Sequence, residues 1–426
     1  MFGNIRFAAA RGHLCGCFGR LINLMKVILY KEKTRTVKQF KSNRRNISTH
    51  GVCFFLPFGL QYFNSKPYST QMALEVTYEL KTESTIGSVD FDHIQFGRVF
   101  ADHMFMATYD GAQWIECKIA PYGPLTLSPA TSALHYGQSI FEGMKAFKAA
   151  DGTPLLFRPF DNAARFNRSA QRMCMPEIPE SLFVEALERL IWVDRQWIPT
   201  KEGSSLYIRP FMFATDDFLG VRPSSRYLFI AWCCPVVAYY SQPLKVKIEE
   251  KYARAAPGGV GFTKCAGNYG AAMLPTREAQ EEGFDQVLWT DPVDHEFLEE
   301  TGTTNCFVVA EDRLITPALT DTMLAGITRD SVISLARAQG IKVEERPIRV
   351  SELKAWHAAG SLQEMFITGT AATLVNIQGF GHQGKYYALE GTGSHSISSS
   401  ILARLDAIRT RQAADPFGWV HPVPAR

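Results

Sequence analysis

A glycine-rich stretch of the chain contains a lysine that could do covalent chemistry. It runs Gly258-Gly-Val-Gly-Phe-Thr-Lys-Cys-Ala-Gly-Asn-Tyr-Gly270, with Lys264 as its one lysine and Tyr269 five residues further on. Glycines let the backbone turn tightly and let a bulky ring approach. A lysine amine in such an enclosed, weakly solvated place can form a Schiff base with a carbonyl compound. A flexible surface loop with a solvated lysine is the alternative, and this stretch alone leaves both open.

The same stretch does not fit two other glycine-rich motifs. A phosphate-binding loop needs Ser or Thr after its lysine, but Cys265 follows Lys264. The glycine spacing also differs from that of a dinucleotide-binding fingerprint. Nucleotide binding is therefore not indicated here.

A second stretch, Glu299-Glu-Thr-Gly-Thr-Thr-Asn305, places acids, hydroxyls and an amide at a turn between two apolar runs. A carboxylate beside a turn is usually solvated. A cofactor with a pyridine ring, however, needs one acid against the ring nitrogen, because the protonated ring stores carbanion electrons. Glu300 is the candidate for this role, with Thr303 and Thr304 as hydroxyl and amide donors.

Together with further motifs, these stretches resemble the branched-chain aminotransferases, which use pyridoxal 5'-phosphate (PLP). Their fold class is shared with D-amino-acid aminotransferases and aminodeoxychorismate lyases. The resemblance runs from about Phe96 to the C-terminus. Besides the two stretches, it is carried by Phe96-Gly-x-x-Phe-x-Asp-His-Met104, Leu134-His-Tyr-Gly-Gln138, Phe141-Glu-Gly-Met-Lys-Ala-Phe147, Leu156-Phe-Arg-Pro159, Ser205-Leu-Tyr-Ile-Arg-Pro210, Gly326-Ile-Thr-Arg329 and Gly369-Thr-Ala371.

The resemblance implies a set of cofactor-binding residues. Lys264 would be the Schiff-base lysine and the proton shuttle, Tyr269 would bind the ring hydroxyl oxygen, and Glu300 would bind the ring nitrogen. The remaining residues would hold the phosphate, since a cation, a helix start and a hydroxyl suit a dianion. They are Arg165, Ile327, Thr328 and Thr370. No metal site is expected.

The resemblance also implies a pocket that accepts both an aliphatic side chain and glutamate. Arg209 would bind the distal carboxylate of glutamate, and the backbone around Thr303 and Ala371 would hold the α-carboxylate. Aromatic walls would remove water from the side chain of leucine, isoleucine or valine. The expected wall residues are Phe96, Tyr136, Phe141, Tyr207, Val221 and Tyr239.

The activity expected from this resemblance is reversible transfer of the amino group of L-leucine, L-isoleucine or L-valine to 2-oxoglutarate. D-amino-acid transamination or a PLP lyase of the same fold is the enzymatic alternative. A PLP-binding homologue without catalysis is a third interpretation, against which the retained Lys264, Tyr269, Glu300 and Arg165 argue. The family implies a homodimer in which one subunit completes the pocket of the other.

The elements that must position these residues begin as an alternation of strands and helices. We expect strands at 155–158, 206–214 and 227–233, the last two buried on both faces, and a helix over 160–174 that begins near Pro159. Ser181 is expected to cap a second helix. After a linker at 237–244 strands dominate. Strands are expected at 246–250, 286–290, 297–301, 305–310, 342–347 and 364–370, and helices at 271–282, 326–339 and 397–411.

These elements predict an α/β fold of two domains, the PLP fold type IV. The expected order is a basic extension over 1–73, a small α/β domain over 74–236, the linker, and a larger strand-rich, PLP-binding α/β domain over 245–426. Two unequal domains around a cleft are a common place for a cofactor.

Composition adds limits on partners. The chain is 46% hydrophobic and 20% charged, which is typical of a globular protein, and its net charge of +3 gives no reason to expect nucleic acid. Its nine cysteines include no C-x-x-C, which argues against a zinc site and a disulfide-stapled fold. The expected partners are small-molecule substrates, and no membrane partner is expected, because the apolar run at 52–60 is shorter than the ~20 residues a span needs.

The first residues differ from the rest in charge. Up to Ala73 the chain has twelve Lys or Arg and a single acid, Glu32. A basic, nearly acid-free segment with Ser and Thr is typical of a mitochondrial transit sequence. The alternative is that translation starts at Met72, which would leave the enzyme in the cytoplasm.

Overall fold

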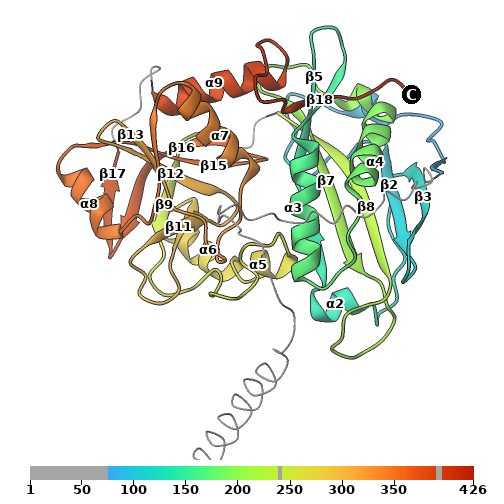
Figure 1. The fold of residues 1–426 in the computed structure, drawn as a ribbon, viewed down its shortest axis with the longest axis horizontal. Helices are drawn as coiled ribbons and strands as arrows, with labels where there is room; N and C mark the ends of the chain where they lie inside the picture. Colours follow the sequence, from blue (N-terminus) through green and yellow to red (C-terminus); the bar gives the residue numbers. More distant parts are fainter. Residues whose placement is uncertain (1–74, 238–241, 390–395) are drawn as a thin grey trace, which may run out of the picture. The chain divides into compact units, whose positions relative to one another are not determined.

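The structure is a computed structural model that describes residues 75–237, 242–389 and 396–426. They belong to one compact unit, Met72–Arg426, which contains two nine-stranded sheets (Figure 1). The predicted extension over 1–73 lies outside the described residues. Among the described residues, no helix combines the length and the apolar character that crossing a membrane requires.

The first sheet uses strands from the N-terminal half and one from the C-terminus. Its order is β1-β3-β2-β8-β7-β5-β6-β18, and β4 pairs with β7. All its pairings are antiparallel except that of β1 with β3. The strands are β1 (Thr77–Tyr78), β2 (His103–Tyr109), β3 (Trp114–Pro121), β4 (Ser139–Phe141), β5 (Met144–Lys148), β6 (Pro154–Phe157), β7 (Ser205–Ala214), β8 (Tyr227–Val236) and β18 (Val420–Pro422).

Helices α3 (Pro159–Arg172) and α4 (Glu180–Val193) lie across β7 and β8 on one face of this sheet (Figure 1). Phe166 of α3 packs edge-on and Phe183 of α4 packs at a tilt against Phe229 of β8, with ring centroids 5.7 and 5.8 Å apart. All three rings are fully buried. This apolar layer holds α3 in place, and α3 carries Arg165. The short elements of this half are the 3-10 turns Ile86–Ser88 and Arg195–Trp197 and the helix α2 (Ser132–Tyr136).

The second sheet follows the order β11-β10-β9-β16-β15-β12-β13-β14, and β17 pairs with β16. Because β11 also pairs with β12 through Glu300 and Asn305, six of its strands form a closed circuit. The strands are β9 (Leu244–Ile248), β10 (Gln286–Thr290), β11 (Leu298–Thr301), β12 (Asn305–Ala310), β13 (Arg313–Thr316), β14 (Lys342–Glu345), β15 (Leu362–Gly369), β16 (Thr373–His382) and β17 (Lys385–Ala388).

The helices around the second sheet bury their apolar faces on it. Val332 and Leu335 of α7 (Ile327–Ala338) and Ile401 of α9 (Ile397–Arg409) share one core with Phe307 and Phe366 of the strands. The remaining helices are α5 (Ala266–Gly270), α6 (Met273–Glu281) and α8 (Val350–Ala358). The packed sheet therefore fixes the positions of the β11–β12 turn and of the start of α7.

The predicted strands and helices agree with the structure within a few residues, and β7 and β8 are buried on both faces as expected. The predicted cap of the second helix is wrong. Ser181 lies inside α4, whose N-cap is Pro179, and no side chain caps that end. A proline at this position starts the helix through its fixed φ without a side-chain hydrogen bond. The predicted linker lies between β8 and β9, partly outside the described residues, and the division into two domains stays a prediction.

Candidate active site

The backbone of Lys264 is hydrogen-bonded to strand β4 of the first sheet and to helix α3, which packs on that sheet. Its amide donates to the Ser169 hydroxyl of α3 at 3.0 Å, and its carbonyl accepts from the Phe141 amide of β4 at 3.0 Å. Cys265 continues this contact through a β-bridge with Ile140. Lys264 is therefore held rigidly at the point where the two sheets meet.

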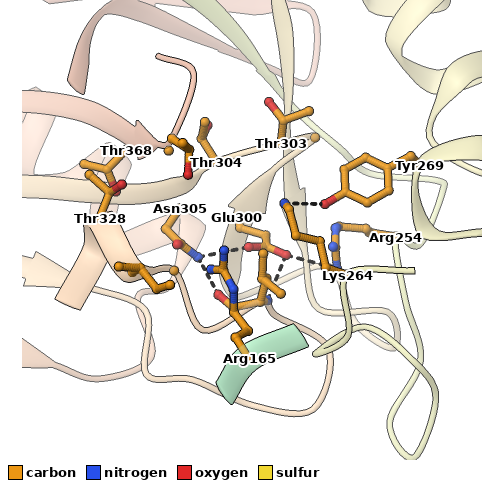
Figure 2. Close-up of a pocket in the computed structure, with 16 residues that line it drawn as sticks. Arg165, Arg254, Lys264, Tyr269, Glu300, Thr303, Thr304, Asn305, Thr328 and Thr368 are labelled. Carbon is orange, nitrogen blue, oxygen red and sulfur yellow. Dashed lines mark hydrogen bonds and ion pairs between the residues drawn. The ribbon is translucent and has the colours of Figure 1, made fainter. Parts of the chain in front are cut away.

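The side chain of Lys264 reaches the hydroxyl of Tyr269, with Nζ and Oη 3.0 Å apart (Figure 2). Nζ also lies 4.9 Å from the centre of the Phe141 ring. Asn268 stabilises the loop itself by donating to the carbonyls of Val260 and Thr263, both at 2.9 Å. A solvated lysine on a flexible loop does not fit these contacts, whereas a held amine does.

Glu300 is a buried carboxylate, 3% exposed, at the end of β11. One oxygen lies 3.0 Å from Arg254 Nη1 and accepts from the Leu324 amide at 3.1 Å. The other accepts from the Asn305 side-chain amide at 2.9 Å. Burial has the largest effect on the pKa of the Glu300 carboxyl and leaves it raised, although the Arg254 guanidinium and the Leu324 amide act to lower it. Three donors thus aim this acid into the same cavity as Lys264 (Figure 2).

Arg165 extends from α3 into that cavity, although it already has a counter-ion. Its Nε and Nη2 each bind one oxygen of Glu142 at 2.7 Å, and Nη1 donates to the Ala325 carbonyl at 3.1 Å. Both charged side chains are buried. Burial lowers the pKa of Arg165, but Glu142 more than offsets this and leaves the pKa raised. The bidentate pair fixes the plane of the guanidinium, so its two remaining N–H donors, one on Nη1 and one on Nη2, have fixed directions.

The start of α7 supplies further donors. Gly326 is its N-cap, and the first amides of a helix have no partner within the helix. A Cβ on Gly326 would lie 1.9 Å from the Asn305 side-chain oxygen, so only glycine lets this helix start approach the β12 strand. Ile327 and Thr328 follow and line the cavity together with Thr368. The buried hydroxyl of Thr368 has no hydrogen-bond partner.

We call this space the polar cavity, and it unites all the residues predicted to bind the cofactor. They are Arg165, Lys264, Tyr269, Glu300, Ile327, Thr328 and Thr370. Its other lining residues include the cation Arg254. The cavity contains one carboxylate but three cations, the first amides of α7 and the Thr368 hydroxyl. This excess of hydrogen-bond donors suits a dianionic phosphate. The residues present therefore fit PLP.

A second cavity of about 600 Å³ adjoins the first and shares Lys264, Tyr269, Thr303 and Thr370 with it. We call it the aromatic chamber. The expected substrate-binding residues that line it are Phe96, Phe141, Tyr207, Arg209, Thr303 and Ala371, and Phe211, Trp232 and Met273 add further apolar surface. Gly143 lies against the Tyr207 ring, and a Cβ there would come within 2.3 Å of its hydroxyl oxygen. That explains why the Phe-Glu-Gly motif ends in glycine.

Among the described residues, Arg209 is the one arginine that lines the aromatic chamber. Its Nη2 donates to the Tyr207 hydroxyl at 3.0 Å, and its Cζ lies 4.6 Å above the Phe141 ring. Its buried Nε has no hydrogen-bond partner. A buried donor without an acceptor costs about 1–3 kcal/mol, which a bound carboxylate would recover.

Three expected pocket residues are not brought into this site by the described chain. Tyr136 and Val221 are 42% and 90% exposed and line neither cavity. They lie close together, since the Tyr136 hydroxyl accepts from the Gly220 amide at 2.9 Å. Tyr239 lies outside the described residues.

The sequence reasoning missed several residues that hold the site together. Arg254 and Asn305 position Glu300, and Glu142 pairs with Arg165. Glu142 stands inside a motif that carried the resemblance, and Asn305 ends the Glu300 stretch, so both were visible without a role. Arg254 had no such signal. The one available clue to Arg254 was that a buried carboxylate such as Glu300 needs a cation nearby.

The family model "Amino-transferase class IV" matches residues 139–380. Branched-chain-amino-acid transaminase 1 of Bacillus subtilis is 42% identical over 335 residues, 78% of this chain and 94% of that protein.

Solved structures of similar fold agree. The branched-chain amino acid aminotransferase of Escherichia coli superposes with a TM-score of 0.64 and 26% identity, covering 76% of this chain and 99% of that one. The branched-chain amino acid aminotransferase of Thermobaculum terrenum, solved in its PLP-form, gives a TM-score of 0.62 at 22% identity, covering 76% of this chain and 98% of that one.

Proposed function

The chain belongs to the class IV aminotransferases, and from this premise we propose that it transfers the amino group of L-leucine, L-isoleucine or L-valine to 2-oxoglutarate. The products are the branched-chain 2-oxo acids and L-glutamate. The observation that carries this proposal is the junction of the two cavities at Lys264. One cavity offers cations and an acid for PLP, and the other offers aromatic walls with a single arginine.

When bound, PLP supplies an aldehyde that condenses with an amine and a protonated ring that accepts the electrons of a broken Cα–H bond. Lys264 provides the amine and moves the proton at the substrate α-carbon. Tyr269 holds that amine through its hydroxyl. Glu300, which Arg254 and Asn305 hold in place, would face the ring nitrogen and favour its protonated form.

The remaining cofactor residues bind rather than react. Arg165, Thr370 and the amides of Ile327 and Thr328, which line the polar cavity, would hold the phosphate. Because Glu142 fixes Arg165, the arginine reaches the phosphate without first losing side-chain freedom.

Dual substrate recognition follows from the aromatic chamber. Its walls remove water from an aliphatic side chain, and each buried CH₂ contributes about 0.8 kcal/mol. Glutamate has a carboxylate at the same place, to which the orphaned donor of Arg209 donates. The backbone at Thr303 and Ala371 binds the α-carboxylate common to all four amino acids.

The test is an assay of the purified chain, saturated with PLP, for glutamate formed from L-leucine and 2-oxoglutarate. Lys264→Ala is expected to lose roughly a hundredfold to ten-thousandfold in kcat, the usual contribution of a proton-transferring group. Lys251→Ala is the matched control, because Lys251 is exposed and contacts Tyr252 outside both cavities. A fully active Lys264→Ala variant, or equal rates with D-leucine, would reject the proposal.

We further propose a homodimer in which Tyr136 and Val221 complete the aromatic chamber of the partner subunit. Their exposure and proximity in one chain support this. The mass from sedimentation should be twice that of the chain. Val221→Asp should raise KM for leucine although Val221 lies outside the chamber of its own chain. A monomer with full activity would contradict this.

We also propose that the basic segment over 1–73 directs the protein to the mitochondrion, on the support of its charge alone. N-terminal sequencing of the mature protein tests this. Cleavage near Arg44–Ser48 would support import, whereas a first residue at Met72 would place the enzyme in the cytoplasm instead.

A further inference from the structure

A third cavity, of about 840 Å³, lies outside the site described above. We call it the rear cavity. It is lined by β5, by the residues leading into β7 and by the end of α9, including Lys145, Lys148, Ser205, Asp406 and Arg409. Ser205 and Tyr207 alternate along β7 and so share one face of the first sheet. The rear cavity therefore opens on the same sheet face as the aromatic chamber.

Lys145 connects the rear cavity to the substrate pocket. Its ammonium donates to the Ala371 carbonyl at 2.9 Å and to the Thr373 hydroxyl at 3.1 Å. Ala371 lies in the turn between β15 and β16, and Thr373 is the first residue after it. This turn carries Thr370 and Ala371 into the two cavities of the active site. The amine thus holds in place the backbone that binds the substrate α-carboxylate.

Lys145 is a buried cation, 8% exposed, held by neutral acceptors. In the described part of the chain, no carboxylate lies within ion-pair distance of Lys145 or Lys148. Asp406, which lines the same cavity, is instead bound to Arg409. Burial and the nearby Arg409 lower the pKa of Lys145 to about 7. A buried cation without a counter-ion is costly, so an anion in this cavity would stabilise the charged form of the amine.

Ser205 gives a second, independent indication of a missing partner. It is 1% exposed, it lines the rear cavity, and its hydroxyl has no hydrogen-bond partner. An ammonium has three donors, of which Lys145 uses two on neutral acceptors, so one remains. The exposed Lys201 at the rim is paired with Asp92, and Glu202 beside it is the other acid of the lining. The third donor of Lys145 and the hydroxyl of Ser205, which both lack an acceptor among the described residues, therefore lie at the inner end of the cavity.

We propose that the rear cavity binds a small oxyanion, a carboxylate or a phosphate, through Lys145, Lys148 and Ser205. A bound anion takes the third donor of Lys145 and keeps the amine charged, which strengthens its hold on the Ala371 carbonyl. The anion thereby controls the turn that binds the substrate. This last step rests on the proposed function, whereas the binding itself does not.

The test is calorimetric titration of the PLP-loaded enzyme with inorganic phosphate and, separately, with acetate, against chloride at equal ionic strength. Saturable binding of either probe, with chloride inert, is expected, and the two arms distinguish a phosphate site from a carboxylate site. Lys148→Met should weaken binding by roughly tenfold to a hundredfold, as for a charged hydrogen bond, and Ser205→Ala by about twofold to tenfold. Lys385→Met, an exposed lysine over Tyr387 on β17, is the control and should bind as before.

Binding of neither probe, or binding that both rear-cavity variants leave unchanged, would overturn the proposal. The link to the active site has its own readout. The bound anion should lower KM for leucine with little change in kcat, and Lys145→Met should abolish this dependence. Anion binding without any effect on KM would refute the link but not the site. If Lys145→Met does not fold, the same KM measurement on Lys148→Met decides.

Discussion

At the scale of single residues, the site depends on how one buried acid is surrounded. Burial favours the neutral form of Glu300 and leaves the pKa of its carboxyl raised, whereas Arg254 and the Leu324 amide favour the charged form, and Asn305 also binds it. A buried charge is stable only with such partners. The same donors fix its direction, so they set the geometry of the acid.

Glu300→Gln removes this charge while keeping the shape of the side chain. We expect PLP to remain bound and kcat to fall roughly a hundredfold to a thousandfold, the usual loss when one preorganised electrostatic partner is removed. Stopped-flow measurement of the leucine half-reaction checks this. Glu299→Gln is the neighbouring control, since Glu299 faces the other side of β11 and accepts from Thr322. If both variants are equally slow, Glu300 has no special role.

Glu299 also predicts a pH dependence of stability. Burial raises the pKa of its carboxyl from 4.5 to about 7. A raised folded-state pKa gives stability that is fully present below pH 4.5 and is lost as the pH rises through about 7. Glu299→Gln, which cannot ionise, should therefore remove this part of the decline. Urea unfolding of both proteins between pH 4.5 and 8 measures it, and parallel curves would contradict the assignment.

Arg209 is expected to distinguish glutamate from leucine as a substrate. Arg209→Ala should reduce kcat/KM for glutamate by about tenfold to a hundredfold more than kcat/KM for leucine, because only glutamate places a carboxylate on the unpaired donor. Steady-state kinetics with each amino acid separately gives the two ratios. Equal losses for both would mean that Arg209 only supports the packing of Tyr207 and Phe141.

At the scale of elements, the segment before β2 is fastened by one carboxylate. Asp102 accepts from the Ser84 hydroxyl, from the Thr85 amide and hydroxyl, and from the Trp197 indole at 2.5 to 3.0 Å. Burial opposes the charge of Asp102, but these hydrogen bonds hold its pKa well below the usual range. Stability from a lowered carboxyl pKa is present above about pH 4 and is lost on acidification.

Asp102→Asn should therefore cost about 1.5–3 kcal/mol in unfolding free energy at pH 7, because a charged acceptor becomes a neutral one that also carries donors. The difference should shrink below pH 4. Denaturant unfolding at both pH values measures this. Asp92→Asn serves as the control, since its ion pair with Lys201 is exposed and such pairs contribute about 0–1 kcal/mol. Equal effects of the two substitutions would refute the role of Asp102.

At the scale of the whole molecule, the described residues all belong to the unit Met72–Arg426. In the described chain the cores draw on residues from Val76 onward. A chain that starts at Met72 should therefore unfold at the same temperature as the full chain and keep its kcat. Thermal unfolding followed by circular dichroism checks this. A start at Asp90, which also removes Ser84 and Thr85, should lower the melting temperature, and a loss already at Met72 would contradict the prediction.

The last strand shows that chain order does not decide which sheet a strand joins. β18, at the C-terminus, pairs with β6 in the first sheet, with Val420 opposite Phe157. No local pattern in the three residues of β18 marks that partner. Such a short strand forms only because the sheet edge offers it unpaired backbone groups.

The sequence by itself pointed to the reactive group and most of its surroundings through a resemblance to a known family. The glycine-rich stretch alone left Lys264 open between a held amine and a solvated one, and the roles expected for Glu300 and for the helix start after Gly326 came from that resemblance. The regular strands and helices followed from apolar periodicity. These features depend on neighbours a few residues away.

Only the tertiary structure decided which distant residues meet. Arg254 with Glu300, Glu142 with Arg165, and Lys145 with Ala371 are separated by 46, 23 and 226 positions. Such pairs form because a buried charge must find a partner or a carbonyl wherever the fold supplies one, and chain distance does not enter that requirement. The packing of the two sheets, rather than any sequence motif, brings these partners together.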